Sequence, residues 1–180
     1  PGLDPARLVG GAGAQPMIDR QRDQPARGAK TGEAVEQSER IGSAGNRDAE
    51  RARVGVPPLR WADNLEAEAG VWARELIGSN RFTHDPTLHG HGENLWTGWG
   101  GRVWTPEAMV GEWIAEKADY RHDVFPNVSR TGNWSDVGHY TQLVWRQTTH
   151  VGCAVETRGD RSVLACRYAP PGNIDGRRAY

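Results

Sequence analysis

Hydrophobic side chains recur at helical spacing after residue 60. One stripe falls three or four residues apart, at Leu65, Ala69, Trp72 and Leu76. This spacing predicts a helix whose apolar side faces a protein core. We expect Asp63 to cap this helix and Glu66 to complete a capping box. We expect the helix to end at Gly78-Ser79-Asn80.

A second helical pattern begins at Thr105, a residue type that favours the N-cap, followed by proline at the first helical position. Its predicted buried face is made by Val110, Trp113 and Ile114. We expect this helix to end near Tyr120 and a polar loop to continue to about residue 137.

Three further elements have weaker signals. Residues 35–53 are charged and compatible with a helix, which Gly55 and Pro57-Pro58 would end. The segment GENLW (92–96) fits a short strand, and residues 138–147 fit a short helix.

The two cysteines of the chain lie in a predicted hairpin. VGCAVE (151–156) and SVLACRY (162–168) are rich in β-forming residues and flank turn chemistry. A two-residue turn at Gly159-Asp160 places residues whose numbers add to 319 opposite each other, and Cys153 and Cys166 meet this condition. The register favours a disulfide over two buried thiols, and a disulfide indicates a secreted or periplasmic protein.

Composition separates the first part of the chain from the rest. Residues 1–34 contain few large aliphatic side chains, so we expect them to be disordered. No aromatic residue precedes Trp61, which indicates a core built mainly from residues 61–180. The net charge of -1 gives no reason to expect nucleic acid as a partner. No apolar run is long enough for a transmembrane segment.

Histidine is the residue type that points most directly to chemistry, since all six histidines follow residue 80. The local run His89-Gly-His91-Gly-Glu93 has two readings. In an extended chain these alternate side chains converge and suit a metal. The intervening glycines weaken any fixed geometry, which favours a solvated loop for His89 and His91. No Gly-x-Ser-x-Gly or His-Glu-x-x-His motif is present.

Four segments in order along the chain resemble the CAP superfamily, which includes cysteine-rich secretory proteins, venom allergens and plant pathogenesis-related proteins. They are VGVPPLRWADNLEAEAGVWA (54–73), GENLW (92–96), GHYTQLVWRQTTHVGC (138–153) and CRYAPPGN (166–173). The resemblance covers residues 47–176. One departure is Arg47-Asp48, where the family often has His-Asn at the start of its first helix.

The resemblance implies an α+β fold, a three-layer α/β/α sandwich with a central antiparallel sheet. It also implies a cleft that carries two histidines and two glutamates, which fall on His84, Glu93, Glu116 and His139 of this chain. Glu112 competes with Glu116 on the same helix. At 100° per residue, Glu116 lies about 60° from buried Trp113 and Glu112 about 100° from it, which favours Glu116.

The implied cleft suggests ligands of two kinds. His84 and His139 would bind zinc or another divalent cation, with Glu93 and Glu116 orienting the imidazoles or holding a water. Some relatives bind sterols or other lipids, for which the candidate residues here are Tyr120, Phe125 and Trp134. The alternative for these three aromatic residues is ordinary anchoring of their loop.

We therefore expect a secreted, monomeric protein with a disordered segment (1–34) and a CAP (SCP-like) domain (35–180), which binds a small ligand in defence or host interaction. The alternative is a metal- or Glu/His-dependent hydrolase, a protease or an esterase, that uses Glu93, Glu116 and His139. Binding is favoured because the sequence has no signature of a nucleophile or an oxyanion hole.

Overall fold

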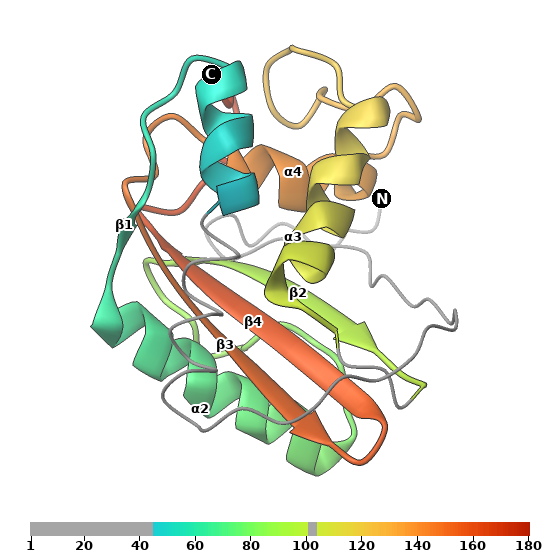
Figure 1. Ribbon diagram of the computed structural model, residues 1–180. Coiled ribbons are helices and arrows are strands. Elements are labelled where there is room, and N and C mark those ends of the chain that lie inside the picture. Colours follow the sequence, from blue (N-terminus) through green and yellow to red (C-terminus); the bar gives the residue numbers. More distant parts are fainter. Residues whose placement is uncertain (1–44, 101–103) are drawn as a thin grey trace, which may run out of the picture.

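The computed structural model describes residues 45–100 and 104–180, which form a four-stranded sheet between two layers of helices (Figure 1). The strands are β1 (Arg60–Trp61), β2 (Gly92–Gly98), β3 (His150–Arg158) and β4 (Arg161–Ala169), in the order β1-β3-β4-β2. Helix α2 (Asp63–Ser79) covers one face, while α3 (Pro106–Ala115) and α4 (Gly138–Leu143) lie on the other. The α+β sandwich is confirmed.

The sheet is mixed rather than purely antiparallel. Strand β4 pairs antiparallel with both β2 and β3, but the short β1 runs parallel to β3. The predicted strand at 92–96 is confirmed and extends to Gly98. Residues 45–53 are helical. The expected disorder of residues 1–34 and the expected helix start at residue 35 concern residues outside the described ranges.

Helix α2 begins where expected, but its cap was predicted wrongly. The N-cap residue is Ala62, without a side-chain hydrogen bond, and Asp63 is the first helical residue. Ala62 N–H donates to the Val151 carbonyl at 2.9 Å. This strand pairing holds Ala62 in an extended conformation, so the helix starts at the next residue, Asp63. Glu66 accepts a hydrogen bond from Trp61 Nε1 at 2.8 Å. Asn80 ends the helix with φ of 54°.

Helix α3 has the predicted cap, since the Thr105 side chain accepts from the Ala108 N–H at 3.3 Å. It ends at Ala115, before the expected Tyr120, and a 3₁₀ turn follows at η1 (Glu116–Ala118). The short helix predicted at 138–147 is α4, which ends at Leu143, four residues before the predicted end. A 3₁₀ turn, η2 (Trp134–Val137), precedes it.

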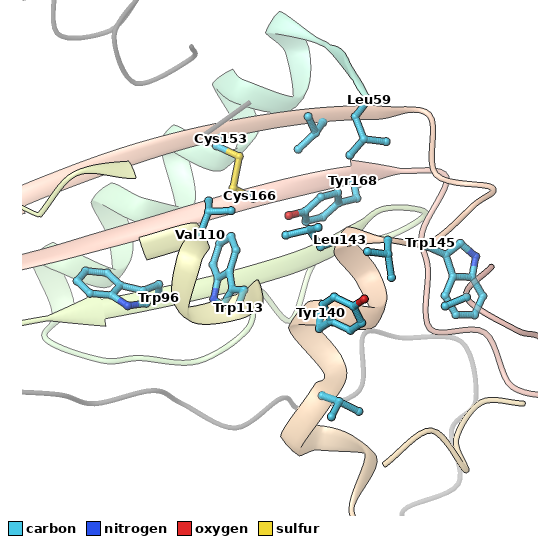
Figure 2. Packing of buried hydrophobic residues seen from close by; sticks show 14 of the residues in the cluster. Leu59, Trp96, Val110, Trp113, Tyr140, Leu143, Trp145, Cys153, Cys166 and Tyr168 are labelled. Atoms are coloured by element: carbon cyan, nitrogen blue, oxygen red, sulfur yellow. A yellow bond between two sulfur atoms is a disulfide. The ribbon is translucent and has the colours of Figure 1, made fainter. Parts of the chain in front are cut away.

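The main core lies between the sheet and the α3/α4 layer (Figure 2). Trp96, Trp113 and Trp145 are among its largest fully buried side chains. A smaller apolar cluster lies under α2 and includes Leu76, Leu95 and Val163. None of the helices within 45–100 and 104–180 is long and apolar enough to cross a membrane.

The hairpin register is confirmed. Cys153 and Cys166 are direct partners across β3 and β4, with their Cα atoms 4.1 Å apart, and their sulfur atoms form a disulfide (Figure 2).

Replacing Cys153 and Cys166 together by serine is expected to lower the free energy of unfolding by about 3 kcal/mol, because the disulfide closes a short loop and restricts the unfolded chain. Denaturant unfolding of the parent and the variant measures the difference. Reductant should affect only the parent. Equal stability of the two proteins would contradict the prediction.

Candidate functional site

Two carboxylate–histidine pairs define the candidate site. In the first, His84 Nδ1 lies 2.5 Å from Glu93 Oε1, and the Glu93 side chain is fully buried. The same oxygen accepts the Asp85 N–H at 3.2 Å. Glu93 is positioned by β2, whereas His84 and Asp85 belong to the loop after α2. The pairing therefore fixes that loop against the sheet.

The second pair joins the end of α3 to the start of α4. His139 Nδ1 lies 2.6 Å from Glu116 Oε1, and Glu116 Oε2 accepts the Tyr140 N–H at 3.0 Å. The His139 ring stacks on Trp113 with centroids 5.7 Å apart and 10° between the planes. The His139 side chain is 1% exposed. Glu116 holds the ring at Nδ1 and Trp113 packs against its face.

The choice of Glu116 over Glu112 is consistent with this geometry. Glu116 is the C-cap of α3 and its side chain is 9% exposed. The helix ends at this residue, so its carboxylate can reach the N-terminal turn of α4. In the sequence, the family resemblance placed the second glutamate at Glu116, and the smaller angle to Trp113 favoured it over Glu112.

Neighbouring residues of β2 hold the two pairs. Glu93 binds His84, while the Asn94 side-chain amide donates to the backbone carbonyl of His139 at 3.1 Å. Asn94 is fully buried and also donates to the Tyr168 hydroxyl at 3.3 Å. One strand thus fixes the loop that carries His84 and the helix that carries His139.

Sequence reasoning missed a buried arginine beside the first pair. Arg167 Nη1 lies 2.5 Å from Glu93 Oε2, and Arg167 Nη2 lies 2.9 Å from Asp85 Oδ2. Arg167 faces Glu93 because β4 pairs with β2 in that register. Burial raises the pKa of Asp85, but hydrogen bonds from Thr87 and the charge of Arg167 lower it by more, so the pKa is below its usual range.

In these contacts the carboxylates hold the imidazoles in place. Each glutamate uses both oxygens in contacts with the protein, and each imidazole uses Nδ1. In a histidine whose Nδ1 is held by a carboxylate, Nε2 is the ring nitrogen through which a metal ion is bound. No group of three or more His, Cys, Asp or Glu side chains is placed to hold a metal within the described ranges.

The alternative local cluster does not form. His91 Nδ1 contacts Glu68 Oε2 of α2 at 3.0 Å, while Glu93 binds His84 and Arg167. His89 is exposed. His89 thus lies in the exposed loop that was expected, whereas His91 is partly buried and held by α2.

The three candidate lipid residues have different surroundings. Tyr120 and Phe125 are buried in the main core, with 6% and 4% exposure, as the anchoring alternative expects. Trp134 is half-buried and packs against Phe125 with ring centroids 5.1 Å apart. Trp134 is therefore the member of the three best placed to meet a ligand.

The fold and the two carboxylate–histidine pairs define a disulfide-linked α/β/α sandwich protein with a histidine–glutamate site. The family model CAP, the cysteine-rich secretory protein family, matches residues 46–168. The chain belongs to this family. This finding confirms the resemblance drawn from the four sequence segments.

Plant proteins are among its similar relatives. Pathogenesis-related protein 1C of Nicotiana tabacum is 41% identical over 72% of this chain and 74% of its own length. Pathogenesis-related protein PR-1 type of Sambucus nigra is 37% identical over 74% and 77%, respectively.

Solved structures share the fold at lower identity. A crystal structure of NaASP2 with Zn2+ aligns with a TM-score of 0.70 at 22% identity, over 80% of this chain and 85% of that one. MpPR-1i aligns with a TM-score of 0.52 at 18% identity, over 78% and 97%. At these identities, the likeness supports the architecture alone.

Proposed function

We propose that this protein is a secreted binding protein that takes up a divalent cation, with zinc as the candidate, through Nε2 of His84 and His139. The observation that carries the proposal is that Glu93 and Glu116 each hold Nδ1 of one imidazole. A carboxylate that accepts from Nδ1–H fixes the ring and its tautomer and makes Nε2 the ligand.

The same contacts favour binding over hydrolysis. A general base needs an oxygen that is available to a substrate proton. Both oxygens of Glu93 and both of Glu116 already contact protein groups. The hydrolase that would use Glu93, Glu116 and His139 remains the second candidate function, and turnover of peptide or ester substrates that is lost in His139→Ala would establish it.

Secretion and a role in defence complete the proposal. The disulfide supports an oxidising compartment. The relatives that carry the name pathogenesis-related protein support a defence role.

Zinc titration is expected to separate the two histidine sets. His84→Ala and His139→Ala should each weaken binding by at least about tenfold, because a site with two protein ligands cannot lose one without large loss of affinity. Glu116→Gln should weaken it by about tenfold through the loss of a carboxylate partner of His139. Calorimetry with zinc alone measures all three variants.

His91→Ala is the matched control, since His91 pairs with Glu68 instead. It should leave zinc affinity within about twofold of the parent value. Loss of binding in His91→Ala, with retention in His84→Ala, would overturn the assignment. Chelation should not unfold the protein, because two ligands contribute little to stability.

A sterol or other lipid is the second ligand that we propose, and Trp134 supports it through its half-buried ring. Trp134→Ala should weaken cholesterol binding by several-fold in a protein that remains folded but is less stable, because the ring also packs against Phe125. Val71→Ala, at an exposed apolar residue of α2, is the control. Phe125→Ala is not informative, since Phe125 lies in the core. Equal binding by the parent and Trp134→Ala in a vesicle assay would contradict the proposal.

A further inference from the structure

Two arginines face each other at the end of the β3–β4 hairpin. Arg158 and Arg161 are direct partners in the strand register, on either side of the turn at Gly159-Asp160. Residues directly opposite each other in an antiparallel pair project from the same face of the sheet, and like charges in these positions repel. None of the described carboxylates forms an ion pair with either arginine. Two positive charges are therefore left together at this end of the sheet.

Arg161 is buried, with 6% exposure, and is held by uncharged groups. Its guanidinium donates at 2.9–3.3 Å to the side chains of Thr97 and Asn80 and to the carbonyls of Leu76 and Arg81. These acceptors stabilise a cation at the C-terminal end of α2 but carry no net charge. Burial lowers the pKa of Arg161, and the group stays protonated at neutral pH. Its charge is therefore fixed in place without a carboxylate to offset it.

A cavity of about 300 Å3 adjoins these arginines, and we call it the hairpin pocket. Ile77 and Asn80 line it from the end of α2, which lies beside the hairpin turn (Figure 1). Asp160 lines it from the turn, and Trp99 from the chain that follows β2. Arg161 lies over the Trp99 ring, 5.4 Å from its centroid. The volume is at the lower end of that of ligand sites, so the pocket suits a small ring.

The groups around the hairpin pocket suit different parts of one ligand. A guanidinium such as that of the exposed Arg158 pairs with a carboxylate through two parallel N–H groups. Trp99 is half-buried, and the negative face of an aromatic ring attracts C–H groups. Asp160 is an acceptor for hydroxyls, and Asn80, whose oxygen binds Arg161, offers its amide N–H groups as donors. A sugar ring with a carboxylate matches all of these groups, whereas an apolar acid matches only the arginines and Trp99.

We propose that the hairpin pocket binds a sugar acid, with the carboxylate of the ligand between Arg158 and Arg161. The sugar ring lies against Trp99, and its hydroxyls reach Asp160 and Asn80. The ligand supplies the negative charge that the chain itself does not place beside the two arginines.

The hairpin pocket is separate from the histidine–glutamate site. Glu93 pairs with Arg167 near one end of β2 and β4, whereas Gly98 pairs with Ser162 at the other end. The proposal therefore does not rest on zinc binding, and calorimetry in the absence of metal tests it.

The test is calorimetry of the full chain with glucuronate, and glucose and acetate are the controls. Glucuronate should bind with a Kd of about 1 mM or below. Glucose lacks the carboxylate and acetate lacks the ring and hydroxyls, so each should bind at least about tenfold more weakly. High salt should weaken the binding of glucuronate. Tighter binding of trigalacturonate than of glucuronate would identify a polysaccharide, rather than a free sugar acid, as the source of the ligand.

Variants of single arginines locate the binding. Arg158→Gln should weaken glucuronate binding at least about tenfold. Without ligand, its thermal midpoint should be no lower than that of the parent, because one of two like charges has been removed. Arg74→Gln is the matched control, since Arg74 is an exposed arginine that already pairs with Glu156 at 3.2 Å. It should bind glucuronate within about twofold of the parent.

Three results would overturn the proposal. They are no saturable binding of glucuronate, equal binding of glucuronate and acetate, and equal binding by the parent and a folded Arg158→Gln variant. If Arg158→Gln does not fold, Trp99→Leu replaces it, and this variant should bind glucuronate several-fold more weakly than the parent. Unchanged affinity in Trp99→Leu would then overturn the assignment of the pocket.

Discussion

Arg51→Ala is expected to destabilise the protein by about 4 kcal/mol. The side chain is fully buried and donates to four main-chain carbonyls, of Pro57, Leu143, Trp145 and Thr148, at 2.6–3.1 Å. Burial lowers its pKa to about 10, so it remains charged at neutral pH. Its removal leaves buried acceptors without a donor and also leaves a cavity, and each of these costs stability.

Arg53→Ala is the matched control, two residues further along the same helix. The Arg53 side chain is 56% exposed and pairs with Glu50 at 2.6 Å. The Glu50 side chain is only 6% exposed, but it keeps Lys117 Nζ at 3.2 Å and the Tyr140 hydroxyl at 3.0 Å as partners when Arg53 is removed, so we expect a loss below about 2 kcal/mol. Denaturant unfolding of the two variants gives the comparison. Similar losses in both would show that the carbonyl contacts of Arg51 do not stabilise the fold.

Arg51 also links stability to the candidate site. Its contact with the Leu143 carbonyl holds the last residue of α4, the helix that begins beside His139. The helix at residues 45–53 thus meets α4 through a buried cation. The Arg47-Asp48 departure from the family pattern lies one turn earlier, where Arg47 is buried and contacts Asp48 at 3.1 Å.

Elements with local signals could be predicted from the sequence. The β3–β4 register follows from one turn and the alternation of strand residues, so Cys153 and Cys166 could be paired. The angle on a helix could decide between Glu116 and Glu112 once the family resemblance had pointed to this helix. The N-cap of α2 could not be predicted from the sequence, because Ala62 is held by a hydrogen bond to Val151, a residue distant in sequence.

In the candidate site, too, residues whose role depends on contacts distant in sequence could not be predicted from local patterns. The four histidines and glutamates were located by resemblance, since nothing local marks them as a group. Arg167 was missed because its role depends on the pairing of β2 with β4, two strands between which α3, η1, η2, α4 and β3 lie in the sequence. The segment CRY showed a β-forming pattern but gave no indication that its arginine is buried.

Arg167 provides the second large expected effect. Its side chain is 1% exposed and lies between Glu93, which is fully buried, and Asp85. Arg167→Met fills much of the same volume but leaves the Glu93 carboxylate without its cation. Breaking a buried ion pair on one side costs about 3–5 kcal/mol. Arg74→Met, at an arginine that is 60% exposed in its pair with Glu156, should cost below about 1 kcal/mol.

A double-mutant cycle distinguishes the ion pair from the packing of Arg167. Glu93→Gln removes the carboxylate charge, so Arg167→Met should cost less in the Glu93→Gln background than in the parent, with a coupling of at least about 1.5 kcal/mol. Denaturant unfolding of the parent, the two single variants and the double variant measures it. Additive losses would mean that Arg167 stabilises the fold by packing alone, and that Glu93 does not need its cation to remain buried beside His84.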